Sequence, residues 1–244
     1  MKALLRWFVL CLLALLGLQL FFALRVVCML WLAPESTSVQ RSQMWQILQR
    51  HQQLPWRQEW TPLERISPQL QRAVIASEDD VFARHDGIRW DAIEKAWDKN
   101  AQAQARAEKQ ASRRPDKAAP QAKVVGGSTI TQQLAKNLLL SGERTLLRKG
   151  QEMLITLMLE ALLPKRRILE IYLNSVEWGE GVFGAEAAAR HYFRKSAAQL
   201  GAWEAARLAV MLPRPRYFEK LPQSAYLAER TEVILGRMNG VVLP

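Results

Sequence analysis

This sequence has almost no cysteine and no strand pattern, and both absences narrow what it can be. Its 2 cysteines, Cys11 and Cys28, both lie in the apolar N-terminal segment. The rest of the chain can therefore hold neither a disulfide framework nor a cysteine-ligated metal site. No alternating strand pattern of useful length and no internal repeat is present, so a mainly helical domain is expected.

Acidic residues are scarce relative to basic ones. The chain of 244 residues carries 34 Lys and Arg against 23 Asp and Glu, a net charge of +11. That surplus predicts an anionic partner, such as nucleic acid, acidic lipid headgroups or a phosphorylated substrate. The length, with 49% apolar residues, suffices for one sizeable domain plus an appendage. The 9 tryptophans are typical of a membrane interface or of carbohydrate stacking.

Residues 7–24 form an apolar run in which only Gln19 is polar, preceded by Lys2 and Arg6. At about 1.5 Å of rise per residue, a helix of this length nearly matches the hydrocarbon core of a bilayer. No A-x-A cleavage site follows, which favours a transmembrane anchor over a cleaved signal peptide. Lys2 and Arg6 should stay cytoplasmic, which predicts a single-pass protein of a bacterial inner membrane whose remaining chain is periplasmic. Such a location argues against nucleic acid as the partner.

Three segments are expected along the chain: an anchor at 1–35, a polar, proline-punctuated connector at 36–66 and a domain at 67–244. The basic, low-complexity residues 101–123 are expected to form a mobile loop. Apolar periodicity and capping signals predict helices at Ser67–Asp80, Trp90–Asn100, 128–140, Thr145–Leu163, Lys165–Asn174, Ala185–Phe193, Ala197–Leu212 and Ala225–Met238.

The stretch 76–87 contains three successive carboxylates, Glu78, Asp79 and Asp80, inside an apolar helical pattern. Acidic residues that interrupt such a pattern lie at the edge of a core or in a cleft, where a carboxylate can take part in proton transfer. The alternative is a solvated helix end, with His85 as a surface histidine.

Two later stretches carry polar residues on predicted helices. Ser128 is expected to cap the helix after Gly126-Gly127, where free N–H groups attract anions, although a capped surface helix is the simpler interpretation. This loop lacks the G-K-[ST] of a Walker motif. Glu152 shares a helix face with Arg148, which indicates either a cation–carboxylate cluster at a cleft or an ordinary salt bridge one turn apart.

Five ordered motifs extend this pattern over about residues 65–220. They are E-D-x-x-F-x-x-H-x-G at Glu78–Gly87, G-G-S-T-I-T-Q-Q-L-A-K-N at Gly126–Asn137, R-K-x-x-E at Arg148–Glu152, K-x-x-I-L-E-x-Y-L-N at Lys165–Asn174 and G-V-F-G-x-x-A-A-A-x-x-Y-F at Gly181–Phe193. In order and spacing they resemble the family 51 peptidoglycan glycosyltransferases. A short chain with one anchor is most similar to the monofunctional biosynthetic members.

The resemblance implies an all-α, lysozyme-like fold and polymerisation of lipid II into β-1,4-linked glycan, with inversion and release of undecaprenyl diphosphate. It also implies that Glu78 is the general base and that Glu152 supports the diphosphate region. The other residues expected to contact substrate are Asp79, Phe82, His85, Ser128, Thr129, Gln133, Lys136, Asn137, Arg144, Arg148 and Lys149. No obligatory cofactor and no protein-held metal are expected, with Mg²⁺ as a candidate cation at the diphosphate.

Two rival functions remain open on the sequence. A lysozyme-like hydrolase would need an acidic pair that flanks the glycosidic bond, but neither an Arg/Lys cluster nor an anchor. A non-catalytic, membrane-anchored scaffold would recruit cell-wall synthesis proteins through its basic surface. The expected partners are lipid II, the growing lipid-linked glycan, the membrane and other cell-wall synthesis proteins, but not nucleic acid.

Overall fold

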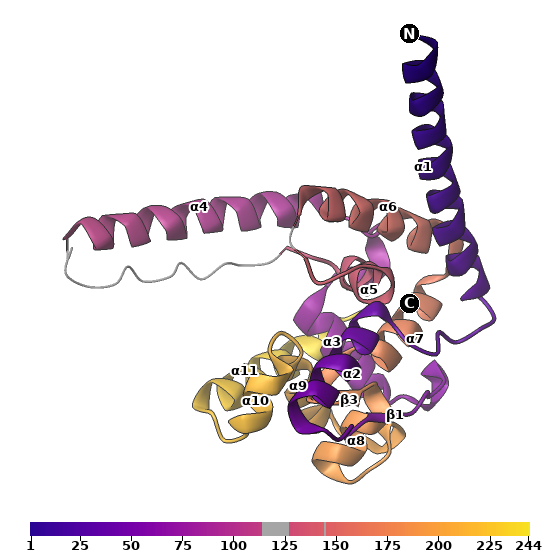
Figure 1. The fold of residues 1–244 in the computed structure, drawn as a ribbon. Helices are drawn as coiled ribbons and strands as arrows, with labels where there is room; N and C mark the ends of the chain where they lie inside the picture. The colour runs from indigo at the N-terminus through magenta and orange to yellow at the C-terminus, as the bar shows by residue number, and fades with distance from the viewer. Residues whose placement is uncertain (114–126, 144) are drawn as a thin grey trace.

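The computed structural model describes residues 1–113, 127–143 and 145–244, and it confirms a mainly helical chain (Figure 1). Its helices are α1 Lys2–Cys28, α2 Ser38–His51, α3 Pro68–Glu78, α4 Trp90–Arg113, α5 Ile130–Leu139, α6 Leu146–Leu162, α7 Lys165–Ser175, α8 Ala185–Phe193, α9 Ala202–Met211, α10 Pro215–Lys220 and α11 Ala225–Arg237. Three short strands, β1 Arg57–Gln58, β2 Glu177–Gly179 and β3 Val182–Phe183, form one small sheet in the order β1-β3-β2.

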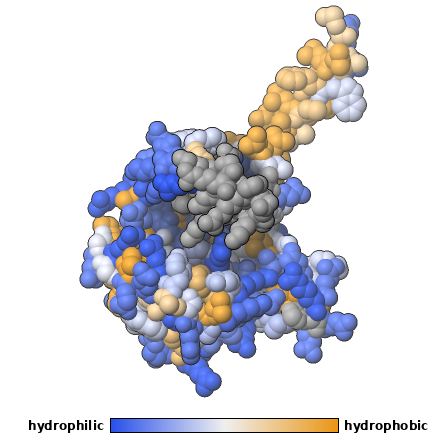
Figure 2. Space-filling view, turned by 90° about the vertical axis from the view of Figure 1, so that its left-hand side faces the viewer, coloured by the Kyte–Doolittle hydropathy of each residue, from blue (hydrophilic) through white to orange (hydrophobic). Residues whose placement is uncertain are grey.

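Helix α1 is long and apolar enough to cross a membrane, and it projects from the domain as an apolar arm (Figure 2). Its first two thirds are exposed, whereas Val26 and Met29 at its base are buried in the domain core. The anchor therefore enters the domain as a packed element, and it does not end in a free linker.

The domain is built from two groups of packed helices. In one, α3 and α11 both pack on α9, and in the other α5 packs between α6 and α7. The apolar residues of α3, among them Leu70, Val74 and Ile75, are fully buried. Ser67 caps that helix and Pro68 occupies its first turn, as the sequence predicts. The carboxyl end of α3 thus reaches the boundary between the two groups.

The small sheet closes the domain beside this boundary. Strand β3 pairs in parallel with β1 and antiparallel with β2. The turn before β3 requires glycine, since Gly181 has φ +73° and an added Cβ would lie 2.0 Å from the Pro55 carbonyl oxygen. The sheet thereby holds Phe183 and Glu177 near the end of α3.

Two helix predictions differ from the structure. Helix α4 continues to Arg113, so residues 101–113 are helical and do not form the expected loop. Their Ala, Gln, Glu, Lys and Arg cannot form a core, yet they are strong helix formers and prolong an existing helix. Residues 114–123 of that expected loop lie outside the described residues. Helix α9 begins at Ala202 rather than Ala197, because Gly201 separates it from a short 3₁₀ turn.

Candidate active site

A cavity of about 610 Å³ lies where the two helix groups meet. One wall comes from the end of α3, from α5 and from the first turns of α6. The other comes from the α7–β2 junction, from β3 and from the turn between α9 and α10. Its lining includes Glu78, Ser128, Gln132, Gln133, Lys136, Asn137, Arg148, Lys149, Glu152, Glu177, Phe183, Leu212 and Pro215.

Glu78, the last residue of α3, faces the middle of this cavity. The Gln133 side-chain amide donates to Glu78 Oε2 at 2.8 Å, and the Tyr172 hydroxyl donates to Gln133 Oε1 at 2.9 Å. Burial raises the pKa of the Glu78 carboxyl, and the hydrogen bonds from Gln133 and Ser77 only partly oppose that shift. A carboxylate with a raised pKa and a fixed orientation is suited to act as a proton acceptor near neutral pH.

A cationic cluster forms the α5–α6 end of the cavity. Glu152 is only 3% exposed, and it accepts hydrogen bonds from Arg148 Nη1 at 2.8 Å and from Lys149 Nζ. Two buried donors of the lining, Arg148 Nε and Gln132 Nε2, have no partner among the described residues. Buried N–H groups are rarely left unpaired in folded proteins. Both are therefore positioned to donate to a bound anion or polar group.

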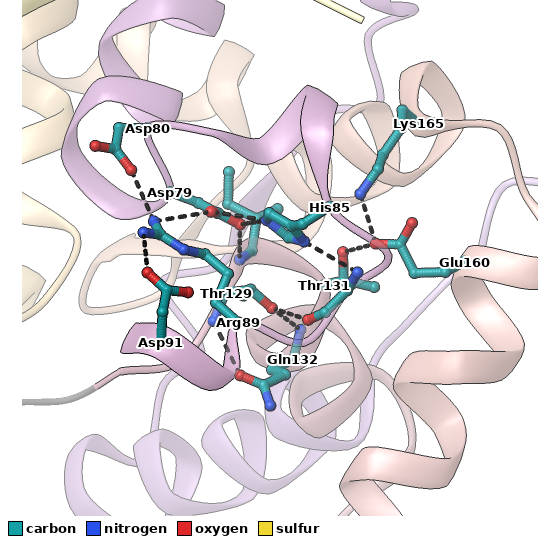
Figure 3. Close-up of polar contacts among 12 residues, drawn as sticks. Asp79, Asp80, His85, Arg89, Asp91, Thr129, Thr131, Gln132, Glu160 and Lys165 are labelled. Carbon is teal, nitrogen blue, oxygen red and sulfur yellow. Dashed lines mark hydrogen bonds and ion pairs between the residues drawn. The ribbon is translucent and has the colours of Figure 1, made fainter. Parts of the chain in front are cut away.

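Directly behind Glu78, Asp79 connects α3 to α5 (Figure 3). Both Asp79 carboxylate oxygens lie 2.9 Å from His85 Nε2, and Oδ2 accepts the Ile130 amide at 3.1 Å. The Gly87 amide donates to His85 Nδ1 at 3.0 Å, which leaves Nε2 as the ring nitrogen that donates to Asp79. Asp79 and His85 thus orient the loop after the base and do not line the cavity.

Thr129, and not Ser128 as the sequence suggested, caps helix α5. Thr129 and Gln132 form a reciprocal capping box, and the Thr129 hydroxyl also donates to the Gly87 carbonyl at 2.6 Å (Figure 3). Gly87 has φ +84°, and an added Cβ would lie 2.7 Å from Glu160 Cγ. The final glycine of the first motif is required here by both its backbone conformation and the close approach of α6.

Phe82 and Lys165 belong to a second supporting contact. Lys165 Nζ lies 4.5 Å from the centroid of the buried Phe82 ring and 2.8 Å from Glu160 Oε1. Glu160 also accepts a hydrogen bond from the Thr131 hydroxyl (Figure 3). Residues of three of the motifs, together with Glu160, therefore hold α3, α5, α6 and α7 together around the cavity.

The structure thus divides the residues expected in the site. Those that line the cavity are Glu78, Ser128, Gln133, Lys136, Asn137, Arg148, Lys149 and Glu152. Those that lie behind it, contrary to a direct contact with substrate, are Asp79, Phe82, His85 and Thr129. Arg144 lies outside the described residues. Short polar and aromatic residues within a motif look alike in sequence whether they support a site or touch its ligand.

No local sequence pattern predicted the cavity wall that lies opposite Arg148 and Lys149. Glu177 lies there, and burial raises its pKa, although Arg216 Nε donates to its Oε1 at 2.6 Å and opposes that shift. Leu212, Pro213 and Pro215 complete this wall from a turn more than 130 positions beyond Glu78. The one available signal was the pair of prolines, which indicated a turn but not its neighbour in space.

Comparison with known proteins agrees with this geometry. The family model described as Transglycosylase matches residues 46–239. A protein of Janthinobacterium sp. (strain Marseille), named biosynthetic peptidoglycan transglycosylase, is 52% identical over 228 residues, which cover 93% of this chain and 91% of that protein. A protein of the same name from Herminiimonas arsenicoxydans is 50% identical and covers 100% of this chain and 99% of its own length. One from Bordetella pertussis is 49% identical, with 93% and 88% covered.

The family match spans most of the chain, and the relatives align with it along nearly its whole length. The motif pattern and the helical fold around the cavity agree with that match. The chain belongs to the transglycosylase family, with the all-α, lysozyme-like fold that its sequence motifs predict.

Proposed function

We propose that this chain polymerises lipid II: the 4-hydroxyl of the GlcNAc of one lipid II attacks the anomeric carbon of the growing strand's terminal MurNAc. The chain is a peptidoglycan glycosyltransferase of cell-wall synthesis, in line with its family and its relatives. The bond that forms is β-1,4, the bond to undecaprenyl diphosphate breaks, and the configuration inverts. The proton of the attacking hydroxyl must go to a base at the centre of the cavity.

Glu78 is the residue we assign to that base. It lies in the cavity between the cationic end and the opposite wall, and its pKa is raised by burial. A sugar hydroxyl is a weak nucleophile until a positioned carboxylate accepts its proton. Gln133, held by Tyr172, binds Oε2, whereas Oε1 accepts a long hydrogen bond of 3.4 Å from the Ser77 hydroxyl and keeps a lone pair for the sugar hydroxyl.

We assign the departing diphosphate to the cationic end. Lys136, Arg148 and Lys149 supply positive charge there, and Arg148 Nε and Gln132 Nε2 supply unpaired donors. Fixed charges and donors stabilise a leaving group as its negative charge develops. Glu152 holds Arg148 and Lys149 in place through its two ion pairs. Glu152 and, on the opposite wall, Glu177 are each already paired with cations, which favours transfer over hydrolysis by an acid pair.

We propose that a divalent cation would bind mainly to the diphosphate of the substrate and not to a site formed by the protein alone. No group of three or more His, Cys, Asp or Glu residues that could hold a metal occurs in the described part of the chain. Mg²⁺ commonly binds through one or two carboxylates and the phosphates of a substrate. Glu152 would supply such a carboxylate, and no step of the proposed reaction requires the ion.

Helix α1 anchors the chain, and we propose that it does so in a bacterial inner membrane with the catalytic domain on the periplasmic side. Support comes from Lys2 and Arg6 at the start of α1, since basic residues remain on the cytoplasmic side. In that orientation the catalytic domain meets the leaflet that presents lipid II. We also expect other cell-wall synthesis proteins among its partners.

The observation that carries this proposal is a raised-pKa carboxylate and a cationic cluster in one cavity. Purified full-length protein in liposomes with lipid II should form glycan polymer and release undecaprenyl diphosphate. Degradation of preformed glycan would indicate the hydrolase instead. Absence of both reactions in a folded, membrane-inserted protein would contradict the proposal and favour the scaffold.

A further inference from the structure

We propose that α1 is docked on the catalytic domain by Gln19 and Arg167, and that this docking positions helix α6 for the reaction. The inference rests on the proposed function, because α6 carries the residues assigned to the diphosphate. It assigns Gln19, Gln151 and Arg167 as positioning residues, although none of them lines the cavity.

The first contact is a reciprocal pair of amides. Gln19 Nε2 donates to Gln151 Oε1 at 3.0 Å, and Gln151 Nε2 donates back to Gln19 Oε1 at 3.0 Å. Gln19 is the only polar residue between Trp7 and Leu24. Both polar atoms of the Gln19 side chain therefore hydrogen-bond to helix α6.

The position of Gln19 along the anchor gives this pair its importance. Gln19 lies nine residues before Cys28, or about 14 Å along the helix axis, and it is flanked by exposed leucines. In lipid, a side-chain amide without a hydrogen-bond partner is destabilising, because no water is present to take the place of that partner. The two glutamines satisfy each other, so their pairing is favoured most strongly when both lie in the membrane.

Helix α6 is suited to that depth. Leu146 and Leu147 are 91% and 89% exposed, and Leu154 and Leu157 are about half exposed. Figure 1 shows α6 crossing the lower part of α1, and the two helices are in contact. An apolar outer face next to a lipid-embedded amide pair is what a helix at the bilayer surface requires.

The second contact fixes the lower end of α1. Arg167 Nε donates to the Met29 carbonyl at 2.7 Å, and Nη2 donates to the Leu32 carbonyl at 3.0 Å. These carbonyls belong to the end of the helix and the turn after it, where acceptors lack intrahelical partners. Glu170 holds the same guanidinium through a bond of 2.6 Å to Nη1. Two separated contacts fix both the place and the rotation of α1.

The Gln19–Gln151 contact lies next to the residues of α6 that we assign to the diphosphate. Gln151 precedes Glu152, and Arg148 lies one turn earlier, so all three belong to the same rigid segment. If Gln19 is removed, the Gln151 amide must find water or another partner. A tilt of α6 that brings it to water would move Arg148 and Glu152 away from the diphosphate.

A crosslinking experiment tests the docking without reference to activity. In full-length protein with Cys11→Ser and Cys28→Ser, Gln19→Cys with Gln151→Cys should be joined in liposomes by a short bifunctional thiol reagent, which spans the gap left when both long side chains are shortened. Leu20→Cys with Gln151→Cys is the matched control and should not, because Leu20 is 60% exposed and faces away. Equal crosslinking of both pairs, or of neither, would overturn the docking. Adding Arg167→Met, which has no N–H donor for either carbonyl, should lower the yield; an unchanged yield would remove Arg167 from the inference.

Kinetics test the positioning. Gln19→Leu and Gln151→Leu should each lower kcat for lipid II polymerisation by about 3- to 15-fold with KM nearly unchanged, the range expected for one interhelical hydrogen bond in a membrane. The double leucine variant leaves no unpaired amide and should return within about 3-fold of wild type. Leu20→Val should match wild type throughout. A rise in KM at constant kcat, or additive single effects, would contradict positioning.

The two proposals fail in distinguishable ways. A wild-type protein that crosslinks as expected but forms no polymer would contradict the proposed function alone. A wild-type protein that polymerises lipid II but shows no selective crosslinking between positions 19 and 151 would contradict the docking alone.

Discussion

Gln133 donates a hydrogen bond to Glu78 across the floor of the cavity, with 2.8 Å between Nε2 and Oε2. Because the Tyr172 hydroxyl donates to the other side of the same amide, Gln133 can present only its NH₂ group to the carboxylate. The bond stabilises the ionised form of Glu78, whereas burial disfavours that form and has the larger effect. The pKa of Glu78 therefore depends on two opposing effects, burial and the Gln133 hydrogen bond, and single substitutions can change either one.

Removal of the Gln133 amide should shift the pH dependence of polymerisation. Activity requires ionised Glu78, so it should be lost as the pH falls through the raised pKa of that carboxyl. Gln133→Leu deletes a contact that lowers this pKa, and the acidic limb should move to higher pH. Tyr172→Phe frees the amide and should cause a smaller shift in the same direction. Profiles of kcat/KM against pH for the three proteins check this, and a shift to lower pH would refute the assignment.

Glu78→Gln should abolish most of the activity and leave the fold intact. The variant keeps shape and polarity but cannot accept a proton, so turnover should fall by about 10²- to 10⁴-fold. Thermal unfolding supplies the control. Because the folded pKa of Glu78 is raised, the ionised carboxylate costs stability as the pH rises above the unfolded value near 4.3, and Gln should be neutral or stabilising there. Retention of a tenth of normal turnover would exclude Glu78 as the base.

Lys149→Ala should impair diphosphate departure more than folding. Lys149 pairs with Glu152 at the cationic end and is partly exposed, so its loss creates no cavity. We expect turnover to fall by about 10²-fold, as for loss of one fixed charge at a leaving group. Lys95→Ala is the matched control, since Lys95 is exposed on α4, pairs with Asp91 and does not line the cavity. Equal activity of both variants would remove Lys149 from the site.

Two of the threonine N-caps, Thr129 and Thr145, should differ in their contribution to stability. Thr129→Ala removes a capping box and the bond to the Gly87 carbonyl, and it should cost about 1–2 kcal/mol in the free energy of unfolding. Thr145→Ala removes the exposed cap of α6 and should cost about 0.5–1 kcal/mol. Denaturant unfolding in detergent measures both, and an equal loss would show that the Gly87 contact contributes nothing.

Truncation of the anchor should reveal where the domain begins. Removal of residues 1–18 deletes only exposed positions, so unfolding of the remaining domain should be unchanged. Removal of residues 1–35 also takes Val26 and Met29 out of the core and the acceptors from Arg167, and it should lower the stability by about 3 kcal/mol or more. Identical unfolding of the two truncated proteins would show that α1 does not belong to the fold.

Much of this protein could be predicted from local patterns. The anchor at residues 7–24, the helix boundaries of α3 and α8, and the apolar face of α6 follow from periodicity and capping, which act within a few residues. The extension of α4 to Arg113 could not be predicted, because the same Ala- and Lys-rich composition suits a solvated helix or a loop. Family motifs then identified Glu78, Arg148 and Glu152, which the structure brings to one cavity.

Other features depend on contacts between residues far apart in the chain. A motif predicts that Asp79 and His85 matter, but only the burial of Asp79 and its bonds to His85 and the Ile130 amide show that the pair supports Glu78 rather than faces the cavity. Glu177, Leu212 and Pro215 reach the site through the packing of α9 and the small sheet, which leaves no local signal. In the sequence, Gln19 is a single polar residue within an apolar helix. The structure shows that its partner is Gln151, 132 positions later. Periodicity reports which face of a helix is buried, whereas the identity of the covering residue depends on how the helices pack in three dimensions.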